Sequence, residues 1–239
     1  MKRAFIGAML IELVAPVLGA YWIDWDGSDW PEAAAYTRSW GNWQGPHQGG
    51  ANRTLENGVL TYDSLYDPGV YDYYYMERPG QMDPGAGELL VMEWVLKVDI
   101  VEGSGDPVAG FFSDDGWAFA FEYAEDHVRS VFENYVSIPI APGLWHEYEV
   151  DSWDMRTYDL CIDGELARQG TLEQVFTQSY VGFGDGVQGA ASLHHWDSFR
   201  FGVIPEPSGF HLLVWVMAWR GARRGALAHA HWQRAAGGM

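Results

Sequence analysis

The segment ELLVMEWVLKVDI, residues 88–100, most constrains what this chain can fold into. Its apolar side chains occupy every second position, and polar side chains lie between them. The apolar set is Leu90, Met92, Trp94, Leu96, Val98 and Ile100, and the polar set includes Glu93, Lys97 and Asp99. Because successive side chains of a β-strand point to opposite faces, this pattern predicts a long strand with one buried face.

Shorter strands with turn signals between them are predicted along the rest of the chain. The clearest is TLENGVLTY, residues 54–62, where Asn57-Gly58 between two alternating segments predicts a hairpin. Further strands are predicted at 70–77, 107–112, 117–123, 127–133, 144–151, 157–163, 179–185 and 193–202. This spacing predicts an all-β fold, an antiparallel β-sandwich of the jelly-roll type. The one candidate helix before residue 205 is a short segment at 32–40.

The charge of the chain limits what it can bind. Residues 21–207 contain 8 Lys and Arg against 32 Asp and Glu, a net charge of −24. Such a body repels nucleic acid and anionic lipid and suits cations or neutral polymers. The 13 Trp and 13 Tyr supply enough apolar surface for a core, and with one cysteine, Cys161, no intramolecular disulfide can form.

Residues 1–20 have the order of a signal peptide. A basic start, MKR, precedes the apolar stretch AFIGAMLI, and APVLGA ends in small residues that suit cleavage near Gly19 or Ala20. Glu12 interrupts the apolar region, and the alternative is a buried N-terminal helix. We therefore expect export, with the mature sandwich over residues 21–203.

The hairpin GLWHEYEVDSWDMRTYDLCIDGELAR resembles the signature of concanavalin-A-like, laminin-G-like jelly rolls. The matching residues are Gly143, Trp145, His146, Tyr148, Val150, Trp153, Asp154, Tyr158, Leu160, Ile162, Asp163 and Gly164. The resemblance covers residues 50–202 and implies this fold, with the last strand beside the first, but it specifies function only weakly. It leaves residues 21–50 open, as a first strand or a lid.

The C-terminal segment, residues 205–239, resembles a PEP-CTERM sorting tail. Pro205, Glu206 and Pro207 precede an apolar run at 210–219, and Arg220, Arg223 and Arg224 follow it. The resemblance implies transient insertion in the inner membrane and processing by an exosortase-type membrane peptidase. It also implies a Gram-negative-type bacterium, with the protein at the cell surface, outer membrane or extracellular matrix. The alternative is a short C-terminal apolar helix that docks on the sandwich.

The hairpin over residues 144–163 is expected to carry an acidic face. If Val150 pairs with Tyr158, then Glu149 lies against Asp159, Glu147 against Cys161 and Asp151 beside Thr157. Like charges directly across a ladder are unfavourable. Water, a cation, Arg156 or Lys97 would have to screen them.

Three carboxylates of this hairpin raise the question of catalysis. In sugar-degrading relatives of the resembled fold, a Glu-x-Asp-x-x-Glu strand supplies the nucleophile and the acid/base. Glu149, Asp151 and Asp154 come near that motif, but Asp154 falls where its side chain would cap a turn. A non-catalytic acidic face is therefore favoured.

Aromatic residues give candidates for sugar binding. Trp117, Phe119, Phe121 and Tyr123 alternate and are expected in the core. Trp145 and Trp153 are better candidates for a sugar platform, with Glu147, Glu149 and Asp159 beside them.

No metal site is firmly predicted. Asp114, Asp115 and Asp185 are candidate calcium ligands, and the alternative is an ordinary turn. His194 and His195 are adjacent in a strand, so they point to opposite faces and do not favour zinc.

The sequence thus predicts an exported, non-catalytic surface or matrix protein with a lectin-like or structural sandwich, whose partners are an exosortase and extracellular polysaccharide. The alternatives are a glycoside hydrolase of the same fold and a purely structural module.

Overall fold

The computed structural model describes residues 21–42, 51–66, 70–77, 79, 83–103, 107–175, 179–186 and 190–205. The chain divides into two units, Met1–Ile204 and Pro205–Met239, and the description below concerns the first. The predicted leader and nearly all of the predicted sorting tail lie outside the described residues, so both stay predictions. Within the described part of the chain, no helix has the length and apolar character needed to cross a membrane.

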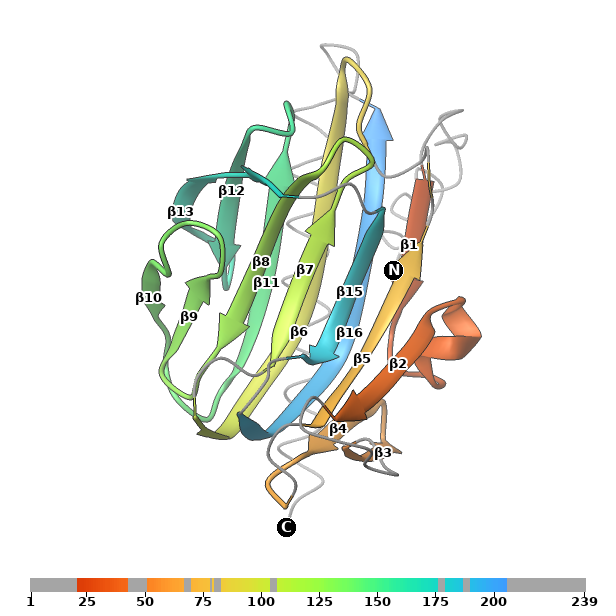
Figure 1. The fold of residues 1–239 in the computed structure, drawn as a ribbon, viewed down its shortest axis with the longest axis vertical. Coiled ribbons are helices and arrows are strands. Elements are labelled where there is room, and N and C mark those ends of the chain that lie inside the picture. Colours follow the sequence, from red (N-terminus) through yellow and green to blue (C-terminus); the bar gives the residue numbers. More distant parts are fainter. Residues whose placement is uncertain are drawn as a thin grey trace, which may run out of the picture. The chain divides into compact units, whose positions relative to one another are not determined.

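Two antiparallel sheets overlie each other and form a β-sandwich (Figure 1). Sheet A has the order β13-β12-β11-β6-β16-β4-β3, with β1 also paired to β16. Sheet B has the order β10-β9-β8-β7-β15-β5-β2, with β14 also paired to β8. The predicted all-β sandwich is therefore confirmed.

The strands have the following bounds. Those of sheet A are β1 Tyr21–Trp25, β3 Asn52–Glu56, β4 Val59–Asp63, β6 Glu88–Glu102, β11 Trp145–Ser152, β12 Thr157–Ile162, β13 Glu165–Thr171 and β16 Ala191–Pro205. Those of sheet B are β2 Thr37–Asn42, β5 Val70–Glu77, β7 Val108–Phe112, β8 Trp117–Tyr123, β9 His127–Ser130, β10 Ser137–Pro139, β14 Glu173–Gln174 and β15 Tyr180–Asp185.

The long strand predicted from ELLVMEWVLKVDI is β6. Its inward side chains from Leu90 to Val98 are buried, because they face sheet B across the core. Ile100 was expected on this buried face, but it is 38% exposed near the end of the strand. Large aromatic rings fill the same core, and Phe119, Phe121 and Tyr123 of β8 are buried there, as the alternation predicted, whereas Trp117 is only partly buried at its edge.

The N-terminal segment contributes two strands to the sandwich. β1 pairs with the last strand, β16, and β2 pairs with β5, so the sandwich begins well before residue 50. The predicted helix at 32–40 is wrong, because only a short 3-10 turn, η1 (Pro31–Ala34), precedes β2. Asn57 and Gly58 both have positive φ (54° and 80°) and connect β3 to β4, as the hairpin prediction required.

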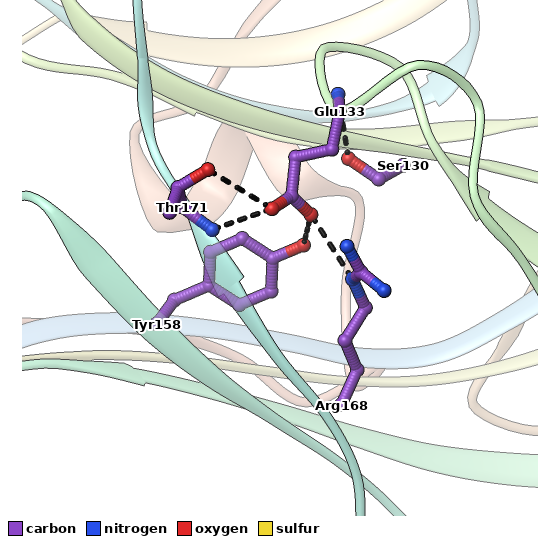
Figure 2. A network of polar contacts seen from close by, with 5 residues as sticks. All are labelled: Ser130, Glu133, Tyr158, Arg168 and Thr171. Atoms are coloured by element: carbon purple, nitrogen blue, oxygen red, sulfur yellow. Dashed lines mark hydrogen bonds and ion pairs between the residues drawn. The ribbon is translucent and has the colours of Figure 1, made fainter.

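The predicted strand at 127–133 ends early, at Ser130. Asn134 and Tyr135 take positive φ of 55° and 54°, so the chain turns and brings the Glu133 side chain inside. There the Glu133 carboxylate accepts hydrogen bonds from the Tyr158 hydroxyl (2.5 Å) and from Arg168 Nε (3.1 Å). It also accepts bonds from the backbone N–H and the hydroxyl of Thr171 (Figure 2). The turn after β9 in sheet B is thereby bonded to β12 and β13 in sheet A.

Candidate ligand-binding face

The hairpin β11–β12 has the predicted faces but a different register. Val150 pairs with Leu160, two residues from the expected partner Tyr158. The four residues from 153 to 156 form the connection, and Asp154 holds it by accepting bonds from the N–H groups of Arg156 and Thr157. A shift of two residues keeps every side chain on its face and changes only its partners.

The observed register brings five acidic side chains to the outer face of sheet A. Glu149 lies opposite Glu93 of β6 and opposite Cys161 of β12, and Asp151 lies opposite Asp159. Glu147 follows on β11. The predicted pairs Glu149–Asp159, Glu147–Cys161 and Asp151–Thr157 are therefore wrong, although these side chains do share one face. Glu93, which the sequence placed on the polar side of β6, is 2% exposed.

A proton on Asp151 relieves the repulsion among these five acidic side chains. Burial, the charges of Glu149 and Glu93 and a hydrogen bond with Glu149 raise the pKa of Asp151 to about 8. At neutral pH Asp151 therefore keeps its proton.

The two cations proposed to screen the carboxylates are engaged elsewhere. Lys97 Nζ lies 2.7 Å from Asp99 Oδ1, and the Arg156 guanidinium lies 3.7 Å from the centre of the Trp117 ring.

Next to these acidic side chains, a polar cluster surrounds Trp145 on the same outer face. Trp145 pairs with Lys97 across β11 and β6, and its ring lies 6.2 Å from the ring of His195 on β16. His195 Nε2 lies 2.9 Å from Asp99 Oδ2, and its Nδ1 lies 2.8 Å from the Thr61 hydroxyl of β4. We call Trp145, His195, Asp99, Lys97 and Thr61 the Trp145 cluster.

The Trp145 cluster is ordered and partly open to solvent. Burial would raise the pKa of Asp99, but hydrogen bonds from Lys97 and His195 outweigh it and lower that pKa, so Asp99 is ionised. Asp99 then accepts a hydrogen bond from Nε2 of His195, and Nδ1 on the other side of the ring is hydrogen-bonded to the Thr61 hydroxyl. The His195 side chain is 18% exposed and Asp99 is 29% exposed, so a ligand can reach both.

Of the sequence-predicted site residues, Trp145, Glu147, Glu149 and Asp159 share this face, but Asp159 pairs with Asp151, six residues along β11 from Trp145. Trp153 does not join them, because it lies in the connection after β11, at the opposite end of that strand from Trp145. Asp154 is also in this connection, where it caps the turn, so Glu149, Asp151 and Asp154 do not form one set.

The structure does not gather the candidate calcium ligands. Asp114 and Asp115 follow β7, whose last residue, Phe112, pairs with Tyr180 at the start of β15. Asp185 is at the other end of β15, five residues and about 17 Å from Tyr180. The N–H of Gly116 bonds to the Ser113 carbonyl oxygen as in an ordinary turn, and Asp83 accepts the N–H groups of Asp114 and Asp115. Among the described residues, no group of three or more His, Cys, Asp or Glu has the arrangement of a metal site.

His194 and His195 point to opposite faces, as predicted. His194 is fully buried in the core and stacks on Tyr62 with ring centres 5.0 Å apart. Its Nδ1 lies 2.8 Å from the Ser192 hydroxyl.

A separate pocket of about 340 Å³ lies beside β1 and η1. Its acidic side chains are Asp24, Asp26 and Asp29, with Trp30 next to them. Asp24 pairs with Arg200, and Asp26 and Asp29 accept backbone N–H groups of their own loop. Asp26 and Asp29 thus hold the loop in place, and Asp24 joins β1 to β16.

The fold and this face define a class, an antiparallel β-sandwich with a polar, tryptophan-bearing outer sheet face. No protein-family model matches the chain, and no curated protein matches it in sequence. Among solved structures, a protein of unknown function from Shewanella oneidensis is similar over 80% of this chain and 89% of its own, with a TM-score of 0.50 and 8% identity. This likeness shows the fold.

Two further solved structures are similar at lower scores. The ligand binding domain of botulinum neurotoxin serotype D, in complex with N-acetylneuraminic acid, is matched over 74% of this chain and 44% of its own, with a TM-score of 0.43 and 14% identity. A sialidase is matched over 67% of this chain and 16% of its own, with a TM-score of 0.43 and 13% identity. The chain thus spans less than half of either protein.

Proposed function

We propose that this protein is an exported cell-surface or matrix protein whose sandwich binds extracellular polysaccharide on the outer face of sheet A, without cleaving it. The observation that carries the proposal is the Trp145 cluster. An indole lies beside an imidazole, a carboxylate and an ammonium group that are held in place by one another.

This combination suits a sugar. A pyranose ring offers an apolar C–H face that stacks on an indole, and hydroxyls that bond to fixed donors and acceptors at its edge. The net charge of −24 over residues 21–207 favours neutral or amine-bearing polymers over acidic ones.

Removing the indole tests the proposal. Trp145→Ala should weaken polysaccharide binding about tenfold or more, because the stacking surface is lost. Trp153→Ala is the matched control, since Trp153 is 48% exposed but lies in the connection after β11, away from the cluster. Equal affinity of the Trp145→Ala variant and the unaltered protein, measured by isothermal titration calorimetry, would contradict the proposal.

A second candidate function, glycoside hydrolysis, is favoured by one observation. Asp151 keeps its proton at neutral pH and lies two residues from Glu149 on the same face, a combination that resembles an acid beside a nucleophile. New reducing ends that disappear in Glu149→Gln but not in Asp154→Asn would support the hydrolase.

Export and sorting belong to the same proposal. The leader-like residues 1–20 and the motif Pro205, Glu206, Pro207 with Arg220, Arg223 and Arg224 support delivery by an exosortase-type peptidase to the surface of a Gram-negative-type bacterium. Mass spectrometry of the exported protein should find an N-terminus near Gly19 or Ala20. Replacing Pro205, Glu206 and Pro207 by alanine should leave the C-terminal segment attached.

A further inference from the structure

A row of tyrosines lies on the outer face of sheet B, directed away from the face discussed above. Tyr71, Tyr73 and Tyr75 alternate along β5 with inward residues that face the core. The ring centres of successive tyrosines are 6.0 and 5.8 Å apart. Ring contacts continue from Tyr75 to Tyr180 at 6.3 Å and from Tyr180 to Phe112 at 4.4 Å. We call Tyr71, Tyr73 and Tyr75 the tyrosine row.

The core does not require this row. The other side of β5 already supplies the buried side chains Val70, Asp72, Tyr74 and Met76, whereas the three tyrosines are only half-buried. The outer face of a sheet in a water-soluble sandwich usually carries small polar or charged side chains. Packing of the core therefore does not explain why three aromatic residues occupy alternate positions on this outer face.

The residues paired with Tyr73 and Tyr75 on the two neighbouring strands have short side chains or none. On β15, Gly182 pairs with Tyr75 and Gly184 pairs with Tyr73. A Cβ atom at Gly182 would lie 3.2 Å from the Cβ of Tyr75 and 2.6 Å from the Tyr74 carbonyl oxygen, so no larger residue fits there. On β2, Thr37 and Ser39 pair with Tyr75 and Tyr73. The rings of Tyr73 and Tyr75 therefore project beyond the residues paired with them on both sides.

The outer face around the row is almost uncharged. Among the described outward positions of β5, β15 and β7, only Glu77 is charged. The others are Tyr71, Tyr73, Tyr75, Tyr180, Gly182, Gly184, Val108, Gly110 and Phe112. In a body with a net charge of −24 this neutrality favours an uncharged ligand. Flat rings with a hydroxyl at one end suit a ligand with apolar ring faces and hydroxylated edges.

We infer that the tyrosine row is a second polysaccharide-binding site, for a neutral pyranose chain that lies along β5 with successive sugar rings on successive tyrosines. Each ring face contacts the C–H face of a sugar, and each phenol bonds to a sugar hydroxyl. The outer faces of the two sheets point in opposite directions, so one molecule would hold two polysaccharide chains. This bridging goes beyond the proposed function, which requires only the face of sheet A.

The test uses the full-length protein and three neutral probes, cellohexaose, mannohexaose and isomaltohexaose, in calorimetric titrations. Tyr73→Ala, at the centre of the row, should weaken binding of the preferred probe roughly five- to tenfold, and Tyr73→Phe should weaken it less because the ring remains. Tyr135→Ala is the control, since Tyr135 is 56% exposed and lies outside the row. Far-ultraviolet circular dichroism and urea denaturation establish that each variant is folded.

The outcomes separate the two sites. A loss of affinity in Tyr73→Ala with Trp145 intact supports the second site. Unchanged binding in Tyr73→Ala and lost binding in Trp145→Ala would overturn the inference and leave the proposed function standing. Binding of none of the probes would also overturn it. If Tyr73→Ala instead converts an oligomer to a monomer in analytical ultracentrifugation, the row is a contact between copies of this chain and the inference is wrong.

Discussion

At the scale of single residues, Asp151 shows how a crowded acidic surface remains compatible with folding. Its raised pKa places a proton among neighbouring carboxyl groups, and the two cations expected to screen them, Lys97 and Arg156, contact Asp99 and Trp117 instead. Such a proton is bound in the folded state and released on unfolding at neutral pH.

Stability should therefore fall as pH rises. The pKa of an unfolded Asp is about 3.9, and that of folded Asp151 is about 8, so between these values the native state binds the extra proton. We expect the free energy of unfolding to drop by about 2–3 kcal/mol from pH 6 to pH 9 and to change little in Asp151→Asn. Urea denaturation at both pH values measures this. Asp126→Asn, with a largely exposed carboxylate, should behave like the unaltered protein.

For His194 we expect the opposite dependence of stability on pH. Burial, with a smaller effect of the His195 charge, lowers the pKa of His194 well below 6.5, so the folded protein keeps it neutral while the unfolded chain takes up a proton below pH 6.5. Stability from this residue is present above pH 6.5 and is lost at about 1 kcal/mol per pH unit below it. His194→Gln should lessen the loss between pH 6.5 and 5, and His127→Gln, at a more exposed position, should not. A steeper loss in His194→Gln would contradict this account.

At the scale of elements, Glu133 joins the two sheets. Although burial alone would raise the pKa of Glu133, bonds from Arg168, Tyr158 and Thr171 outweigh it and lower that pKa. Its stabilising effect is therefore present above the pKa of an unfolded Glu and is lost as pH falls through the lowered value.

Replacing the Glu133 carboxylate should weaken the connection between the two sheets and lower the stability of the protein. In Glu133→Gln an amide N–H₂ takes the place of one acceptor oxygen and faces hydrogen-bond donors, which should cost about 2 kcal/mol. Glu165→Gln, exposed at the start of β13, is the control and should be neutral. Urea denaturation measures the free energy of unfolding of both variants. Equal values would show that the hydrogen bonds of Glu133 do not stabilise the protein.

Sequence alternation predicted the elements well because it depends only on the period of a strand. It placed β6 and the faces of β11 and β12 correctly, since a side chain keeps its face under a shift of two residues. It did not predict their partners, because register depends on how Trp153–Arg156 turn and on the cap that Asp154 provides. The Trp145 cluster was missed because its members come from four strands separated by up to 134 positions.

At the scale of the whole molecule, the sandwich presents two unlike outer faces. That of sheet A is acidic and carries the Trp145 cluster, and that of sheet B carries the nearly neutral tyrosine row. A protein that binds polymer on both faces would act as a link in a matrix, without needing an enzymatic activity. The central claim in this account is ligand binding at the Trp145 cluster.

Hydroxyl-radical footprinting of the full-length protein tests that claim most directly. The protein would be oxidised with and without a saturating polysaccharide from a panel of neutral and amine-bearing polymers, and the modified residues identified by mass spectrometry. We expect Trp145 and His195 to be protected by the bound polymer, while Trp153 reacts equally in both samples. Unchanged oxidation of Trp145 in the presence of a polymer that binds the protein would contradict the account.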